Sequence, residues 1–134
     1  MSKTTVKAEF VAEGDYLEPE IISGLMQINP DEAWRKGEQI ANKQKNRRTG
    51  SWSIGTNFEE SFDVNEQLSK ITIMLESKKD ALQSMRETYN LEYAFIITIK
   101  IENNSKPAIH FNSDLIRFAD LIKAEIGVDL YIYS

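Results

Sequence analysis

The chain has 134 residues, of which 41% are hydrophobic and 28% charged, and its net charge at neutral pH is −5. This composition is typical of a folded domain rather than a disordered chain, and the acidic balance argues against a general affinity for nucleic acid. The absence of cysteine excludes disulfides, thiolate zinc sites and cysteine nucleophiles. We expect a single α+β domain over residues 1–134.

The N-terminal residues lack the apolar core of a signal peptide, and no stretch of the chain has the apolar length of a membrane span. The longest apolar run, residues 93–99, ends at Lys100 and is far shorter than a bilayer requires. It is typical of a buried strand. We therefore expect a cytoplasmic protein with no membrane contact.

The first third of the chain predicts a strand and then a helix. Residues 4–13 alternate between apolar and polar side chains, which indicates a half-buried strand. Pro19 suits the first turn of a helix, and Pro30 is expected to end that helix. Residues 31–34 then resemble one tight helical turn.

A hairpin is the least regular element of the prediction. Residues 38–44 and 51–56 resemble two strands, joined by a polar tip at residues 45–50. In the second strand, Trp52 and Ile54 lie two positions apart and should therefore share one face of the sheet.

Residues 58–90 show the apolar spacing of helix. Asp63 followed by Glu66 is a capping-box arrangement, and Ser77 repeats a helix-start signal. Two helices, or one helix broken near Ser77, fit the pattern equally well.

The last third predicts strands on both sides of one helix. Residues 92–102 are apolar on both faces and should form a strand inside the sheet. Residues 108–111 read as a short strand, and Ser113 as the cap of a helix that Gly127 follows. Residues 128–133 close the chain as a strand, with its alternation placing Leu130 and Ile132 inward.

The expected order is therefore β-α-β-β-α-α-β-β-α-β. Hairpins between helices favour a mainly antiparallel sheet with three to four helices packed on one face.

Both tryptophans flank a basic segment in this acidic chain. Six lysines and arginines stand against the single acid Glu38; they are Arg35, Lys36, Lys43, Lys45, Arg47 and Arg48. Arginine and tryptophan are enriched among residues that dominate interfaces, and adjacent arginines can bind carboxylates or phosphates. Candidate contacts with a partner or an anion are Trp34, Arg35, Arg47, Arg48 and Trp52. Alternatively, the tryptophans belong to the core and the lysines keep a hairpin tip soluble.

Catalytic and metal-binding patterns are missing from the sequence. His110 is the only histidine, and its neighbours are apolar rather than a nucleophile and an orienting acid. Residues 50–55 lack both the nucleophile-elbow context and the lysine of a phosphate loop. No acidic cluster has calcium-loop spacing. We therefore expect no enzyme, no metal and no cofactor.

Short motifs spread over most of the chain carry a family resemblance. They are Gly14-Asp15, Leu17-x-Pro19-x-x-Ile22, Ile28-x-Pro30-Asp31, Trp34-x-x-Gly37, Gly50-x-Trp52, the helix opening near Glu60 to Leu68, and Val128-Asp129-Leu130-x-x-Tyr133. With them the chain resembles the bacterial proteins grouped as domain of unknown function 4279. This resemblance implies no activity or site residues. Analogy with small proteins of toxin–immunity gene clusters suggests an immunity role.

Three functions remain open from the residues alone. The first is a non-catalytic module that binds a partner protein. The second is a regulatory domain that binds a small ligand or anion near Trp34. The third is an enzyme using His110 or carboxylates. A homodimer formed through the strand edge at Val128–Tyr133 is compatible with each of them.

Overall fold

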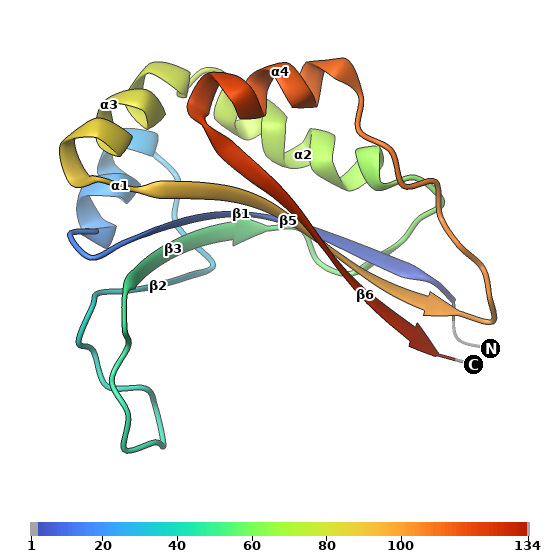
Figure 1. The fold of residues 1–134 in the computed structure, drawn as a ribbon, viewed down its shortest axis with the longest axis horizontal. Coiled ribbons are helices and arrows are strands. Elements are labelled where there is room, and N and C mark those ends of the chain that lie inside the picture. The colour runs from blue at the N-terminus through green and yellow to red at the C-terminus, as the bar shows by residue number, and fades with distance from the viewer. Residues whose placement is uncertain (1–2, 134) are drawn as a thin grey trace.

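The computed structural model describes residues 3–133, which form one twisted sheet with its helices on one side (Figure 1). The strands are β1 (Thr5–Gly14), β2 (Glu32–Trp34), β3 (Gly50–Gly55), β4 (Glu59–Glu60), β5 (Glu92–Glu102) and β6 (Ala124–Tyr133). The helices are α1 (Pro19–Met26), α2 (Val64–Glu76), α3 (Lys79–Tyr89) and α4 (Ser113–Ile122). The strand order is β2-β3-β1-β5-β6, and β4 pairs with β1. Only the β5–β6 pair is parallel. The predicted α+β class is confirmed.

The core lies between the sheet and the helix layer. Alternate residues of β1 and β5 are buried there. The period-two pattern of β1 predicts this burial, and the apolar run of β5 predicts its place inside the sheet, which is confirmed. Phe10 stands at the centre, with its ring centroid 5.3 Å from that of Tyr93 and 5.4 Å from that of Phe95. The ring of Phe118 of α4 packs against this group, with its centroid 6.3 Å from that of Phe95. Aromatic contacts of this kind tie the two central strands to the helices.

The predicted start of α2 and the break after it are both present. The Asp63 carboxylate accepts a hydrogen bond of 2.9 Å from the backbone N–H of Asn65, and this bond lowers the pKa of Asp63. The second half of a capping box is missing, because the Glu66 carboxylate instead accepts from the Ser61 hydroxyl at 3.5 Å. α2 stops at Glu76 and α3 begins at Lys79, so the break falls at Ser77, which ends α2 rather than starting α3.

The region between α1 and β3 differs from its prediction. Helix α1 ends at Met26, before Pro30, with Gln27 in the left-handed conformation. Residues 32–34 form strand β2 rather than a helical turn. Long-range bonds decide this: the Asp31 N–H donates to the Ser53 carbonyl at 2.8 Å, and the Gly55 N–H to the Asp31 carboxylate at 2.7 Å.

The predicted first hairpin strand, residues 38–44, is an irregular loop whose one ladder pairing is the bridge from Gln39 to Asn46. The hairpin itself exists, but β2 takes the place of its first strand, six residues earlier. The predicted second strand is confirmed as β3. Trp52 and Ile54 do share a face, and both are buried.

The C-terminal third also differs in detail. Residues 108–111 make a single bridge, from Ala108 to Asp63, and Asn112 rather than Ser113 caps α4. The helix ends at Ile122, so Gly127 lies inside a longer strand. Leu130 and Ile132 face the helix side but lie beyond α4, and they are 50% and 69% exposed. Figure 1 shows β6 leaving the helix layer in this half.

A buried tyrosine makes the stability of this fold sensitive to alkaline pH. The Tyr93 hydroxyl donates a 2.6 Å hydrogen bond to the Leu82 carbonyl, and burial raises the pKa of Tyr93 well above its ordinary 10.0. The stability that the protonated phenol confers is therefore complete below pH 10.0 and is lost as the pH rises toward the folded-state pKa. Denaturant titrations above that pH should show a loss of up to about 1.4 kcal/mol per pH unit. Tyr93→Phe should remove this decline, whereas the exposed Tyr131→Phe should keep it.

Candidate functional site

One side of the sheet carries no helix of residues 3–133, and we call this side the open face (Figure 1). The strand register places on it eight carboxylates and two lysines: Glu9, Glu13, Glu32, Glu60, Glu92, Glu102, Glu125 and Asp129, with Lys7 and Lys100. Between them stand small or uncharged side chains. The open face is thus strongly acidic, whereas a solvated sheet face commonly mixes both signs of charge.

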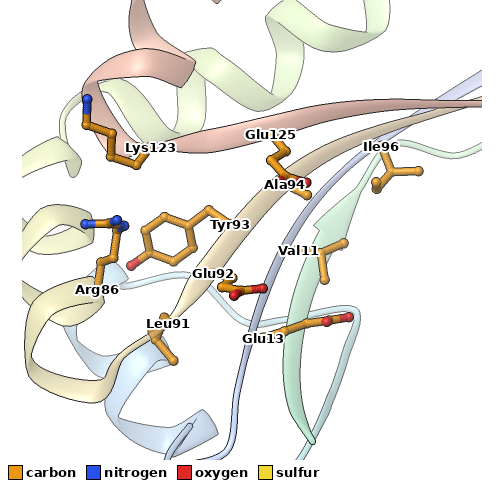
Figure 2. A pocket seen from close by; sticks show the side chains of 10 residues that line it. All are labelled: Val11, Glu13, Arg86, Leu91, Glu92, Tyr93, Ala94, Ile96, Lys123 and Glu125. Carbon is orange, nitrogen blue, oxygen red and sulfur yellow. The ribbon is translucent and has the colours of Figure 1, made fainter.

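A shallow groove of about 470 Å³ lies at the end of the open face (Figure 2). Its floor is apolar and comes from two neighbouring strands, with Val11 on β1 and Ala94 and Ile96 on β5. Three carboxylates surround this floor, those of Glu13, Glu92 and Glu125. Arg86 of α3 and Lys123, which follows α4, lie at the opposite end of the groove beside Tyr93 (Figure 2). The groove therefore has a negative side and a positive side.

These charges are largely unneutralised within residues 3–133. Glu13 and Glu92 are directly opposite each other on β1 and β5, an arrangement of like charges that destabilises a sheet. In this part of the chain neither of them, nor Arg86, forms an ion pair, and Lys123 has only a 3.4 Å contact with Asp120. A ligand or partner of complementary charge would relieve the repulsion.

The basic segment forms a loop, residues 35–49, that projects from the open-face side of the sheet, away from the helices (Figure 1). Backbone hydrogen bonds hold its two arms together, from the Gly37 N–H to the Arg47 carbonyl at 2.9 Å and from the Ile40 N–H to the Lys45 carbonyl at 2.8 Å. We call this segment the basic loop. It stands beside the acidic sheet as a separate surface of opposite charge.

Trp34 and Arg47 form an ordered pair at the base of the basic loop. The Arg47 guanidinium lies 3.7 Å from the centroid of the Trp34 ring, and the indole N–H donates to the Thr49 carbonyl at 3.0 Å. Such cation–π contacts contribute about 0.5–1 kcal/mol at exposed sites. Both side chains are half-buried, and Arg48 beside them is exposed.

Two of the six basic residues are neutralised by acids near α1. Arg35 binds the carboxylates of Glu18 and Glu20, and the hydrogen bond with Glu18 raises the pKa of Arg35. Lys36 lies 3.4 Å from the Asp15 carboxylate. Arg35 thus anchors the loop to the body of the protein, and the free positive charge of the loop comes from residues 43–48.

Trp52 lies apart from the other candidate residues. Its side chain is on the helix side of β3, wholly buried, and its indole N–H donates to the Ser23 hydroxyl at 3.0 Å. The structure therefore brings Trp34, Arg47 and Arg48 together and places Trp52 on the opposite face of the sheet.

The residues considered for catalysis or metal binding occupy ordinary structural positions. His110 is exposed on the segment before α4, where its backbone carbonyl accepts from the Asn65 amide at 2.9 Å. Residues 50–55 form β3 rather than a catalytic turn or a phosphate loop. Among residues 3–133, no group of three acidic, histidine or cysteine side chains is arranged to hold a metal ion. No helix in that range is long and apolar enough to cross a membrane.

Comparison with protein families identifies one match. The model of the family described as Domain of unknown function (DUF4279) covers residues 3–133. The chain belongs to this family. No curated protein and no solved structure matches it.

The motifs of this DUF4279 chain serve its architecture. A side chain at Gly50 would come within 2.9 Å of the Gly14 carbonyl oxygen and 3.0 Å of Leu17, so the strands β1 and β3 meet only if this residue is glycine. Leu17 and Trp52 are core residues. Resemblance carried by such residues identifies the fold and leaves the site to be inferred from its own geometry.

Sequence reasoning missed the acidic groove of this DUF4279 chain. Glu13, Glu92 and Glu125 lie far apart in sequence. Glu13 and Glu92 look like ordinary polar residues at strand ends, and Glu125 falls within the helix that the sequence predicts before Gly127. Only the β1–β5–β6 order brings them together. The alternation of residues 4–13 predicted the strand face that Glu13 takes, but nothing local indicated which strands are neighbours.

Proposed function

We propose that this chain is a non-catalytic module that binds a partner protein through the open face of its sheet and the basic loop beside it. The observation that carries the proposal is the open face, on which eight carboxylates stand against two lysines. Potentials of opposite sign steer association and select partners. The partner's contact surface is accordingly expected to be basic where it meets the sheet and acidic where it meets the loop.

The repulsion between carboxylates of the groove supports this proposal. Glu13 and Glu92 oppose each other across β1 and β5, and repulsion between such pairs costs the folded chain some stability. A lysine or arginine of the partner placed between them would remove that repulsion on binding. Complementary charge then adds affinity as well as orientation.

The basic loop supplies a second and chemically different contact. Trp34 and Arg47 belong to the residue types that dominate interface energies, and their stacking restricts both side chains before a partner arrives. Arg48 is exposed beside them and free to bind a carboxylate bidentately.

An immunity-type role is the specific form of this proposal that we favour. A bacterial toxin with a basic surface, such as a nuclease, would fit the acidic open face. This assignment rests on analogy with small proteins of toxin–immunity clusters and on the charge of the face.

A second candidate function is a domain that binds a small ligand. The groove of about 470 Å³ favours it, because Arg86 and Lys123 oppose three carboxylates across an apolar floor. That arrangement would suit a molecule with both a cationic and an anionic group. The ligand site then lies at the groove and not at the basic loop.

The test is affinity capture from a lysate of the encoding organism, with charge-reversed variants as baits. Glu13→Lys/Glu92→Lys changes the open face, and Arg47→Glu/Arg48→Glu changes the basic loop. Glu76→Lys/Glu87→Lys makes the same change of charge as Glu13→Lys/Glu92→Lys, but on exposed helix positions, and serves as the matched control. Circular dichroism should show all baits folded.

We expect wild type and the helix control to retain one stoichiometric protein that both other variants lose, and raising the salt concentration should weaken the capture. Equal retention by all baits would refute the proposed surface. If wild type captures nothing at physiological salt, the protein-binding proposal fails, and a thermal-shift screen with zwitterionic compounds tests the groove.

A further inference from the structure

The two edges of the sheet differ in how they are protected. The edge strand β2 has three residues and leads directly into the basic loop. The other edge strand, β6, has ten residues with no lysine, arginine or proline, and nothing within residues 3–133 pairs with its outer side. Proteins usually shield such edges with charge, proline, bulges or short strands. β6 has only Glu125 and Asp129, both on the open face.

The side chains of β6 are as exposed as its backbone. Beyond the part that α4 covers, Leu130 and Ile132 on the helix side are 50% and 69% exposed, and Tyr131 on the open face is 49% exposed. Val128 and Tyr133 are also exposed. Large apolar side chains on both faces of an unpaired edge mark a surface that other chains cover.

We propose that this edge pairs with the β6 edge of a second copy, antiparallel, about a two-fold axis that passes through Val128. A strand of ten residues pairs over nine of them when the axis lies at this residue. The proposal concerns self-association and does not depend on the binding role of the open face.

Charge favours this register over the neighbouring one centred on Asp129. With Val128 on the axis, Glu125 of one copy faces Tyr131 of the other and Asp129 faces Gly127, so no acid opposes an acid. Moving the axis to Asp129 would place two aspartates directly opposite each other, which destabilises a sheet.

The apolar residues match in the same register. On the helix side, Ile126 of one copy meets Leu130 of the other. The C-terminal half of each β6, which its own α4 leaves uncovered, then lies beside the N-terminal half of the other β6, which is covered by the α4 of that copy. Leu121 of α4 is itself 42% exposed. The result is one continuous sheet with all helices on one side and both open faces on the other.

Sedimentation equilibrium of the purified chain tests the association. We expect a mass approaching twice 15.4 kDa as the concentration rises. Leu130→Lys should return the mass to that of one chain, because a lysine at the paired edge would face an apolar residue. Leu25→Lys on α1 is the matched control, since Leu25 is also 50% exposed, and it should keep the dimer. A wild type that stays monomeric at all concentrations overturns the proposal, as does a dimer that survives Leu130→Lys.

Cysteine cross-linking tests the register, since the chain has no native cysteine. Paired residues of antiparallel strands have Cα atoms about 4.5–5.5 Å apart, within the range of a disulfide. Val128→Cys should therefore cross-link under a mild oxidant. Ile132→Cys is more exposed, but its two copies would lie roughly 27 Å apart along the strands, and it should remain uncross-linked. Faster cross-linking of Ile132→Cys than of Val128→Cys would refute this register.

Discussion

Replacing Trp52 with alanine should destabilise the folded chain by about 3–5 kcal/mol, the usual cost of removing a buried aromatic side chain. Its ring is wholly buried between β3 and α1, and its indole N–H donates to the Ser23 hydroxyl. Losing the ring leaves a cavity at the contact that holds α1 on the sheet. Urea denaturation followed by circular dichroism measures the change, with the slope of the transition checked for constancy.

Two matched variants separate the causes of this loss. Ser23→Ala removes only the hydrogen bond and should cost about 1 kcal/mol. Trp34→Ala removes the other tryptophan, which is half-buried under Arg47, and should cost about 1–2 kcal/mol from one hydrogen bond and one cation–π contact. Equal losses for the two tryptophans would contradict the assignment of Trp52 to the core and of Trp34 to the loop surface.

Phe95→Ala should have an effect of the same size, about 3–5 kcal/mol. Phe95 is fully buried at the middle of β5, and its ring lies against Phe10 of β1 and Phe118 of α4. The substitution therefore loosens the sheet and the helix layer together.

Ile96→Ala is the natural control for Phe95→Ala because it changes the next residue of the same strand. Ile96 faces the open side and is half-buried, so we expect a loss of about 1–2 kcal/mol. The ratio of the two losses in unfolding free energy compares the contribution of the helix side of the sheet with that of the open face. A larger loss at Ile96 would mean that the open face is covered in solution.

Sequence patterns predicted those elements whose local signals agree with their tertiary contacts. The alternation of β1 reflects the difference between a buried and a solvated face, and the apolar run of β5 indicates a strand inside the sheet. Asp63 caps α2 through its own neighbours in sequence. In these segments the local and the long-range preferences point to the same structure.

The misassigned segments are those in which long-range contacts override the local pattern. Residues 32–34 follow a proline and resemble a helical turn, but hydrogen bonds from Asp31 to β3 hold them extended. Helix α4 ends at Ile122, and Lys123 after it adopts φ 59° without the glycine or asparagine that usually marks a helix end. Gly127, four residues later, was therefore the only visible stop signal.

The candidate site was predicted in part for the same reason. The basic loop is continuous in sequence, so its charge was visible, although the ion pairs of Arg35 and Lys36 with acids near α1 were not. The open face is assembled from six strands, and its composition depends on their order. No local signal carries that information.

The pairing of β1 with β5 has a consequence for how the chain folds as it is synthesised. Glu13 pairs with Glu92, so the ribosome must add 79 further residues before the central strand pair can begin to form. At ordinary translation rates of 5–20 residues per second this takes roughly 4–16 s. In that interval the nascent β1 can pair only with β3 and the two residues of β4, and the apolar row around Phe10 has no complete helix layer over it. The emerging chain is therefore expected to need chaperone protection until β5 has been translated.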